Sequence, residues 1–428
     1  MKRNLHIMYV LSEFVTERDT GGIATYYDNI SRILADDGNK ITIFVLSDVN
    51  EKIDFYPGIV VNRVNLNTES IDASIPGSFI RYWSSGMRQV IQKYIESDKS
   101  VDIIQYASYK GLGVDRFDNI PTVVRISSFQ PLMRAASAID FNVNHVYKCK
   151  TAADYLELLT VVKADAVYSP SYLMADVFKK ESGRNVSVIE SPFFPNKNNF
   201  SPEIPKILKK KKYIFTVGTL SLLKGSKTIG DCVYEVLDRN KEVYWVFAGT
   251  DVPWVGKDGN YILSSEYIRR KAGTYSDRLI FLGKIQHTMV MEIIANSDIC
   301  VMPSRIDNLA NSGIEAMSLG KVVVGTEGSS YEQLIEDDKS GYLIPRDNYK
   351  ELFYAINKGL DLTIEEKEEI GKRAKERTKK MSPEIIKEIL LNFYYRTISN
   401  FNGKAEYEYD ADYQRIISEY KKVSKTVG

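Results

Sequence analysis

Cysteine and long apolar runs are scarce in this sequence of 428 residues, and each scarcity excludes a class of protein. The three cysteines, Cys149, Cys232 and Cys300, lie far apart and are odd in number. They therefore form neither a disulfide framework nor a metal-binding spacing, which fits a reducing compartment and predicts a cytoplasmic location. No stretch of about eighteen apolar residues occurs, so no transmembrane helix is expected.

An excess of charge of one sign is also missing. The chain has 57 lysines and arginines against 56 aspartates and glutamates, a net charge of +1. This balance gives no reason to expect a nucleic-acid partner. The lysines at 209–212 could touch an acidic membrane surface, but such a like-charge block is more often a solvated linker. Peripheral contact with the inner face of a membrane therefore stays open as the lesser alternative.

Strand and helix signals alternate along the whole chain. The first half has a helical pattern at 23–38 and Val- and Ile-rich runs that predict strands at 5–12, 40–47, 101–108, 122–128, 166–171 and 186–192. The second half has similar runs at 213–218, 243–249, 278–284, 298–304, 321–326 and 341–345. Continuous apolar runs are typical of parallel strands that are covered on both faces.

The length of the chain exceeds what one hydrophobic core usually supports, so two domains are expected. We predict an α/β fold with two Rossmann-like domains whose parallel sheets face each other across a cleft. The predicted boundaries are an N-terminal acceptor-binding domain at 1–195, a Pro-, Asn- and Lys-rich linker at 196–212, a C-terminal donor-binding domain at 213–382, and helices at 383–428 that pack back toward the N-terminal domain.

The segment that connects two of the predicted strands, 298–304 and 321–326, contains two acidic residues. The stretch "SRIDNLANSGIEAMSLGK" (304–321) contains Asp307 and Glu315 with seven residues between them. Ser312 and Glu315 have the spacing of a capping box, which predicts a helix over 313–319 that ends at Gly320. In open α/β sheets, ligands bind beyond the carboxyl ends of the strands. On this stretch alone, a capped helix and a ligand site are both open.

Two glycine-containing turns stand at equivalent positions in the two halves. Gly21 and Gly22 separate the first strand from its helix, and Lys224 with Gly225 does the same in the second half. Glycine lets a backbone approach a ligand, and a helix N-terminus attracts anions. A plain tight turn or a surface lysine would also explain each turn by itself. The first turn lacks the G-x-G-x-x-G pattern, which argues against a dinucleotide oxidoreductase.

The order of these motifs resembles the retaining GT-B glycosyltransferases, the large group of nucleotide-sugar enzymes related to glycogen and sucrose synthases (glycosyl transferases group 1, family 4-like). Capsule and surface-glycan transferases of bacteria are among its members. The matching string is specific at this spacing, and it consists of Pro303-Ser304-Arg305, Asp307, Glu315-Ala316-Met317 and Gly320-Lys321-Val322-Val323.

The resemblance implies a retaining hexosyltransferase-like enzyme of polysaccharide biosynthesis. The donor would be a nucleotide-diphosphate sugar, with a UDP-sugar expected first, and the acceptor a hydroxyl of a glycan, a lipid-linked sugar or a protein. By resemblance, Asp307 and Lys224 are the catalytic residues, facing the donor sugar and the diphosphate. The other donor-binding residues implied are Gly21, Gly22, Thr219, Leu309, Ala310, Asn311 and the ribose ligand Glu315.

The sequence departs from this group at several positions, including a later Gly-Gly turn that reads Ser329-Ser330 here. Asp307 stands where glutamate is usual, Thr219 where arginine is frequent, and Ser127 where histidine is common. Arg125 and Arg305 are candidates to replace the missing cation. Ile285 is a further candidate for the donor site.

No Asp-x-Asp or histidine cluster demands a metal, so neither a metal nor another cofactor is expected. Two other classes of function stay open. One is a non-catalytic GT-B protein that binds a sugar nucleotide or glycan to assist a partner transferase, which Thr219 and Ser127 favour and Lys224 and Glu315 oppose. The other is a sugar-nucleotide epimerase, which would need no acceptor.

Overall fold

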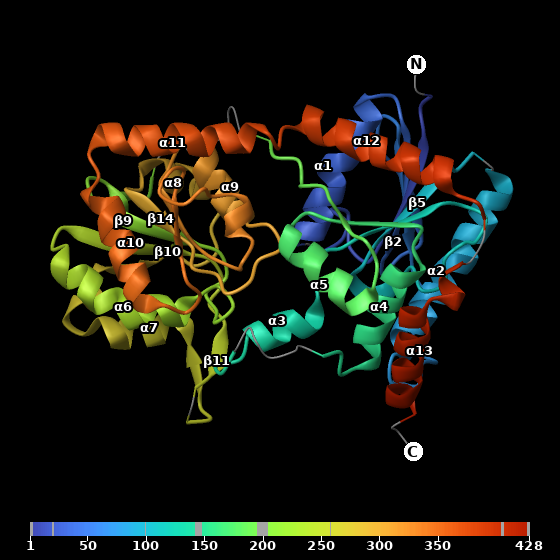
Figure 1. Cartoon of the computed structure of the whole chain (residues 1–428), viewed down its shortest axis with the longest axis horizontal. Coiled ribbons are helices and arrows are strands. Elements are labelled where there is room, and N and C mark those ends of the chain that lie inside the picture. The colour runs from blue at the N-terminus through green and yellow to red at the C-terminus, as the bar shows by residue number, and fades with distance from the viewer. Residues whose placement is uncertain are drawn as a thin grey trace. The chain divides into compact units, whose positions relative to one another are not determined.

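The protein is represented by a computed structural model, which describes residues 3–18, 21–98, 100–141, 148–194, 204–256, 258–403 and 406–425. The chain divides into two compact units (Figure 1). Unit 1 comprises Met1–Pro131, Lys148–Pro192 and Pro383–Gly428, and unit 2 comprises Leu132–Tyr147 and Phe193–Ser382.

Unit 1 is built on an eight-stranded sheet in the order β3-β4-β2-β1-β5-β6-β7-β8. Its strands are β1 (His6–Leu11), β2 (Lys40–Leu46), β3 (Glu51–Tyr56), β4 (Ile59–Val64), β5 (Ile103–Ala107), β6 (Thr122–Arg125), β7 (Ala166–Ser169) and β8 (Ser187–Val188). Every pairing is parallel except the β3–β4 hairpin at one edge. All six residues of β1 are buried, as expected for a central strand covered on both faces.

The helices of unit 1 include two from the end of the chain. They are α1 (Gly22–Asp36), α2 (Ser78–Ser97), α4 (Ala152–Lys163), α5 (Tyr172–Ser182), α12 (Pro383–Asn400) and α13 (Ala411–Ser424), with short η1 (Tyr109–Gly111) and η5 (Glu406–Tyr409). Helix α12 contributes Leu390 and Tyr394 to the core beside Tyr9 and Tyr27. The Tyr394 hydroxyl donates to Gln105 Oε1 on β5 at 2.6 Å, so the C-terminal segment completes the core of this unit.

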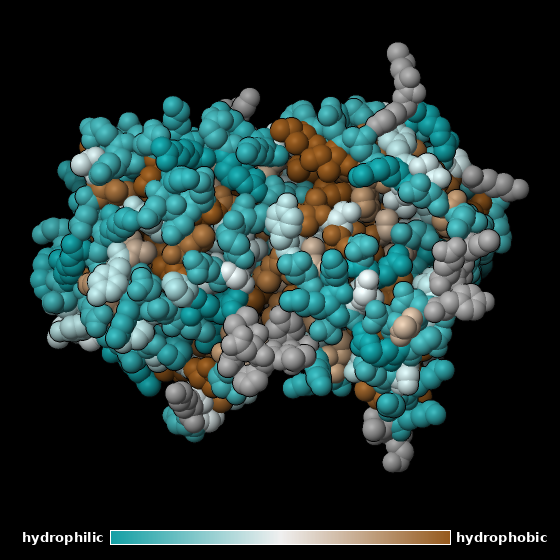
Figure 2. Space-filling model, in the orientation of Figure 1, coloured by the Kyte–Doolittle hydropathy of each residue, from teal (hydrophilic) through white to brown (hydrophobic). Residues whose placement is uncertain are grey.

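The start of α12 also exposes apolar side chains. Figure 2 shows a hydrophobic patch over the first part of this helix, where Ile385 and Ile389 are 43% and 42% exposed.

Unit 2 has a six-stranded sheet in the order β13-β10-β9-β14-β15-β16. Its strands are β9 (Lys212–Val217), β10 (Val243–Ala248), β13 (Leu279–Phe281), β14 (Ile299–Val301), β15 (Val323–Thr326) and β16 (Tyr342–Ile344). All are parallel, and numbered along the chain they give the doubly wound order 3-2-1-4-5-6. A separate antiparallel hairpin, β11 (Pro253–Val255) and β12 (Tyr261–Leu263), follows β10.

Helices cover both faces of the second sheet. They are α6 (Ser226–Arg239), α7 (Ser264–Ala272), α8 (His287–Asn296), α9 (Asn311–Ser318), α10 (Tyr349–Asp361) and α11 (Ile364–Lys379), with short η2 (Lys206–Leu208), η3 (Gly273–Arg278) and η4 (Tyr331–Gln333). Alternate residues of β9 enter different cores, since Tyr213 and Phe215 pack in one cluster and Ile214 in the other. This alternation is what a strand buried on both faces requires.

The predicted α/β architecture with parallel sheets is confirmed. The β3–β4 and β11–β12 hairpins were not predicted, because their strands are short or half-exposed and lack continuous apolar runs. The long helix α2 was not predicted either. Residues 132–141, which the sequence placed within an N-terminal domain, belong to unit 2 and include most of α3 (Gln130–Ala136). The first part of the predicted linker, 196–203, lies outside the described residues, whereas 204–212 includes η2 and the first residue of β9.

Candidate functional site

The strongest candidate residues of unit 2 lie at the point where its strand order reverses. Strands β9 and β14 are neighbours, but the chain continues from them toward opposite edges of the sheet. The loop after β9 ends at Lys224 and Gly225, and the loop after β14 holds Asp307. Ligands of open α/β sheets bind at such a switch point, beyond the carboxyl ends of the strands.

Glycine allows these two loops to approach each other. Gly225 is the N-cap of α6 and has φ of +79°, a left-handed conformation. A Cβ at this position would lie 2.0 Å from the carbonyl oxygen of Pro303 in the other loop. The Arg305 amide adds a direct bond, donating to the Leu223 carbonyl at 2.8 Å. The backbone therefore fixes the separation of Lys224 and Asp307.

Lys224 and Asp307, the two predicted catalytic residues, form an ion pair. Lys224 Nζ lies 2.5 Å from Asp307 Oδ2, and the side chains are 34% and 16% exposed. The Asp307 amide donates to the Ser329 carbonyl at 3.0 Å, which anchors the acid to the turn after β15. An exposed ammonium held by one carboxylate can still receive a second anion, because a lysine carries three donors.

The predicted capping box is wrong. Helix α9 begins at Asn311, its N-cap is Ala310, and no side chain caps it, so Ser312 lies inside the helix. Gly313 packs against Tyr331, where a Cβ would be 2.6 Å from the ring. The predicted end is correct, since Gly320 follows the helix with φ of +74°.

Glu315 has a different partner, His287 at the start of α8. His287 Nε2 lies 2.9 Å from Glu315 Oε1, with the carboxylate side chain 18% exposed. The hydrogen bond to Glu315 raises the pKa of His287 above its usual value. The sequence analysis did not select His287, although histidine occurs only three times in the chain and this one follows Ile285 by two residues.

The predicted diphosphate-lining segment leads into α9. Leu309 and Ala310 are 9% and 2% exposed, whereas Asn311 is exposed at the start of the helix. The first amides of an α-helix have no intrahelical acceptor and favour anions. Their position after Asp307 places them at the same edge of the sheet as the ion pair.

Thr219 and Ile285 lie in the loops that follow β9 and β13, at the same sheet edge. Thr219 is exposed, and Ile285 packs partly buried against the core cluster that contains Ile314 of α9. Thr219 thus lies in the loop that holds Lys224, and Ile285 packs in the same cluster as α9, the helix that holds Glu315.

Arg305 is engaged in holding unit 2 together. Its side chain is 3% exposed, and its Nε lies 2.8 Å from Asp347 Oδ1. The same guanidinium donates to the carbonyls of Ala136 and Ala138 at 3.1 and 2.6 Å. These contacts fasten residues 132–141 to this unit and leave Arg305 poorly suited to bind a diphosphate.

The glycine turn of unit 1 is occupied by a carboxylate. Gly21 is the N-cap of α1, and its amide and that of Ala24 both donate to Glu13 Oε1 at 3.2 Å. An acid thus sits where the resemblance assigns a phosphate. By contrast, a Cβ on Gly22 would meet no heavy atom of the described chain within 4 Å.

The remaining candidates of unit 1 follow β6. Arg125 is 5% exposed, lies 3.6 Å from the centre of the Tyr26 ring and donates to Ser191 Oγ at 3.1 Å. The Ser127 amide donates to Ser108 Oγ at 3.1 Å. Arg125 is therefore a buried cation of this unit, stacked on an aromatic ring rather than paired with an acid of the described chain.

Comparison with known proteins agrees with this geometry. Residues 197–377 match the family described as Glycosyl transferases group 1. This segment is similar to that family over somewhat less than half of the chain. It contains Lys224, Asp307, Glu315 and His287, so the candidate residues of unit 2 all lie within the matched family.

A curated relative matches a smaller part of the chain. Spore coat protein SA of Bacillus subtilis is 26% identical over 166 residues, which are 38% of this chain and 42% of the relative. The chain thus covers less than half the length of this relative.

Solved structures share the fold over nearly the whole chain, and that fold is GT-B. Sucrose-phosphate synthase from Thermosynechococcus elongatus has a TM-score of 0.69 at 17% identity, covering 92% of this chain and 99% of that protein. The Anabaena protein HepE, crystallised with UDP and glucose, has a TM-score of 0.65 at 14% identity and covers 91% of this chain and 100% of its own.

Within the described ranges, no three side chains of His, Cys, Asp or Glu gather into a group that could hold a metal ion. Among the helices that the structure describes, none combines the length and hydropathy needed to span a bilayer.

Proposed function

We propose that this protein is a retaining glycosyltransferase that transfers a sugar from a UDP-sugar to a hydroxyl of a glycan, a lipid-linked sugar or a protein. The observation that carries the proposal is the Lys224–Asp307 pair at the switch point of the segment that matches the glycosyl transferases group 1 family. The UDP and glucose in the HepE crystals support UDP as the nucleotide.

In this proposal, donor binding replaces contacts that the free protein makes within itself. The ribose hydroxyls would take the carboxylate of Glu315 from His287, because one carboxylate accepts two hydrogen bonds from vicinal hydroxyls. The diphosphate would lie between the Lys224 ammonium and the first amides of α9. Asp307 would then orient both the ammonium and the donor sugar.

The proposed reaction breaks the bond between the sugar carbon and the phosphate oxygen. Negative charge grows on the leaving diphosphate, where Lys224 and the helix N-terminus would stabilise it. The acceptor hydroxyl attacks from the same face and gives its proton to an oxygen of the leaving phosphate, which retains the anomeric configuration. This route needs no glycosidase-like pair of carboxylates and no metal ion.

The proposed setting follows from the same chemistry. Nucleotide sugars are cytoplasmic substrates, so we place the enzyme in the cytoplasm, with peripheral contact at the inner face of the membrane when the acceptor is lipid-linked. Biosynthesis of a polysaccharide or surface glycan is the proposed role.

The experiment is an assay of the purified chain with UDP-sugars and a panel of acceptors, read by NMR of the new anomeric centre. We expect a product with the anomeric configuration of the donor, formed equally well with EDTA present. An inverted product would overturn the retaining mechanism, and a strict requirement for Mg²⁺ or Mn²⁺ would overturn the metal-free account.

A second candidate function is a sugar-nucleotide-binding protein without catalysis. The carboxylate of Glu13 on the amides of Gly21 and Ala24 favours it, since this acid competes with a phosphate for α1. Saturable UDP-sugar binding with neither transfer nor slow donor hydrolysis would support this candidate against the enzyme.

A further inference from the structure

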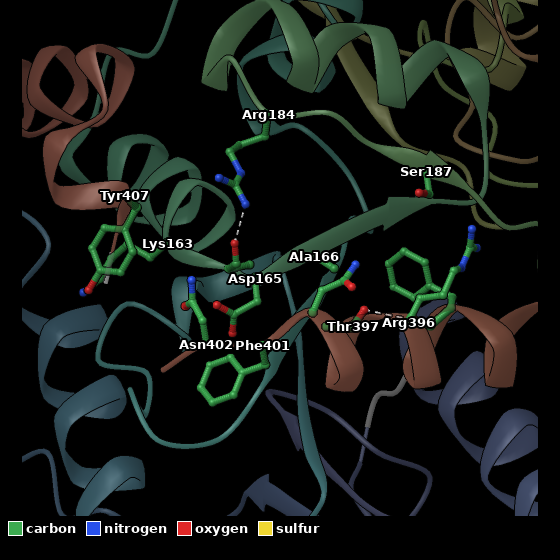
Figure 3. Close-up of a pocket in the computed structure, with 13 residues that line it drawn as sticks. Lys163, Asp165, Ala166, Arg184, Ser187, Arg396, Thr397, Phe401, Asn402 and Tyr407 are labelled. Atoms are coloured by element: carbon green, nitrogen blue, oxygen red, sulfur yellow. Dashed lines mark hydrogen bonds between the residues drawn. The ribbon is translucent and has the colours of Figure 1, made fainter. Parts of the chain in front are cut away.

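Unit 1 contains a cavity of about 390 Å³ at the amino edge of its sheet (Figure 3). Its wall includes Ala164 and Asp165, which precede β7, the first residue of β7, Ala166, and the end of α12. Gly21 follows β1, and β1 is parallel to β7 through β5 and β6. The cavity and the glycine turn therefore lie at opposite edges of the same sheet, and the cavity is separate from every candidate residue named above.

The lining of this cavity has an excess of positive charge. Lys163, Arg184 and Arg396 line it, against the single carboxylate of Asp165. That carboxylate is already neutralised, because Arg116, which is not part of the lining, places NH1 3.0 Å from Asp165 Oδ1. The three lining cations are therefore not balanced by the acid of the lining.

The two lining arginines have few partners. Arg184 donates to the Ala164 carbonyl at 2.6 Å, and Arg396 Nε makes a long contact of 3.4 Å to the Asn392 carbonyl. Neither forms an ion pair with an acid of the described residues. Each guanidinium has five N–H donors, so most of these donors remain for a ligand. Burial lowers the pKa of Arg184, against the opposing charges of Asp410 and Asp165.

A purely structural role would explain part of this arrangement. Helix α4 ends at Lys163, and cations at a helix C-terminus stabilise its dipole. Arg116 already donates to the Lys163 carbonyl, and Arg184 uses one bond on Ala164. This role accounts for one nitrogen of Arg184 and for none of Arg396, and it does not explain a cavity of the size of a small-molecule site.

The other lining groups suit a small polar ligand. Figure 3 shows Arg184 pointing toward Asp165 and Asn402 across the pocket, with the rings of Phe401 and Tyr407 beside them. Phosphate esters combine an anionic group with a less polar body, and arginine binds phosphate oxygens through paired N–H donors.

We propose that this cavity is a binding site for a phosphate monoester, with Arg184 as the anchoring donor and Arg396 adding positive potential at the rim. The ester is either a soluble metabolite or the headgroup of an anionic lipid. The site is independent of the proposed glycosyl transfer.

The test uses the full chain carrying Lys224→Ala, so that phosphate binding at the proposed donor site contributes little. Titration calorimetry with glycerol 3-phosphate examines the soluble source, and co-sedimentation with vesicles containing phosphatidic acid examines the lipid source. Phosphatidylcholine vesicles are the lipid control. Arg32→Gln is the matched protein control, because Arg32 is a partly exposed arginine of the same unit, on α1, where it pairs with Asp28.

We expect saturable binding of one probe, weakened about tenfold or more by Arg184→Gln and about threefold by Arg396→Gln, and unchanged by Arg32→Gln. Binding of glycerol 3-phosphate identifies a soluble ester, and binding of phosphatidic acid vesicles alone identifies a headgroup. If the Arg184→Gln protein does not fold, the loss of probe binding in the Arg396→Gln protein tests the proposal alone, because Arg396 is exposed. Absence of binding to both probes, or equal binding by the Arg396→Gln and Arg32→Gln proteins, would overturn the proposal.

Discussion

The carboxyl edges of the two sheets differ in how their polar groups are occupied. In unit 2, Lys224 and Glu315 are partly exposed and are paired with residues that a ligand could displace. In unit 1, Arg125 is buried against Tyr26 and the start of α1 is covered by Glu13. Unit 2 therefore presents polar groups that a ligand can bind, whereas the corresponding polar groups of unit 1 are paired within the unit.

The largest effect on catalysis is expected from removing Lys224, which forms the ion pair with Asp307 in unit 2. Lys224→Ala should lower kcat/KM for transfer by a factor of about a hundred or more, because losing one charged donor to a leaving oxyanion costs roughly 3–4 kcal/mol of barrier. Kinetics with a UDP-sugar and the best acceptor would measure it. Lys227→Ala is the control, since Lys227 lies on the first turn of α6 and pairs with Asp231. Equal losses in the two variants would remove Lys224 from the site.

The next effect concerns Glu315. Glu315→Gln should raise the donor KM by roughly ten- to a hundredfold, since hydrogen bonds to a charged group contribute about 1.5–3 kcal/mol. The melting temperature should change little, because this acid does not cap α9.

Ser312→Ala is the control for Glu315. Because Ser312 is not the N-cap, this substitution should leave both the donor KM and the melting temperature nearly unchanged. If Glu315→Gln lowers the melting temperature without changing the donor KM, Glu315 has a structural role and does not bind the donor.

A smaller effect depends on pH. The hydrogen bond to Glu315 raises the pKa of His287 above its ordinary value of 6.5, so the imidazolium holds the carboxylate at low pH. Its contribution to stability is present below pH 6.5 and is lost as the pH rises through the raised pKa. Donor binding should release this proton, and the donor KM should therefore fall as the pH rises through that window. His287→Gln should flatten the profile, and an unchanged profile would show that His287 does not compete with the donor.

The smallest effect is expected in unit 1, where Glu13 accepts hydrogen bonds from the start of α1. Glu13→Gln removes the negative charge from the start of α1, where an anion is worth about 0.3–1 kcal/mol. If Gly21 and Gly22 receive the diphosphate, UDP-sugar affinity should rise by a factor of roughly two to five, as measured by calorimetry. Unchanged affinity would show that these glycines do not contact the donor.

Much of the fold and part of the site could be predicted from the sequence. The central strands were predictable because parallel strands buried on both faces are continuous apolar runs, as in β1 and β9. The pairing of Lys224 with Asp307 was implied only by family resemblance, since 83 residues separate them along the chain. For Glu315, the local spacing suggested a helix cap and the resemblance implied a ribose ligand. Neither indicated the contact with His287, which comes from another helix.

The departures in unit 1 were harder to predict for the same physical reason. Glu13 lies eight residues before Gly21, and nothing in a turn sequence indicates that a nearby acid will fold back onto the helix end. Residues 132–141 join unit 2 through bonds to Arg305, a tertiary contact that no local pattern encodes.

We propose that a UDP-sugar binds at the switch point of unit 2. Amide hydrogen exchange of the full chain with and without UDP-glucose tests it most directly, because backbone amides report on each loop separately. We predict slower exchange at 224–229 and 309–315 and no change at 163–187 in unit 1. Protection confined to unit 1, or no protection at 309–315 at saturating UDP-glucose, would contradict the claim.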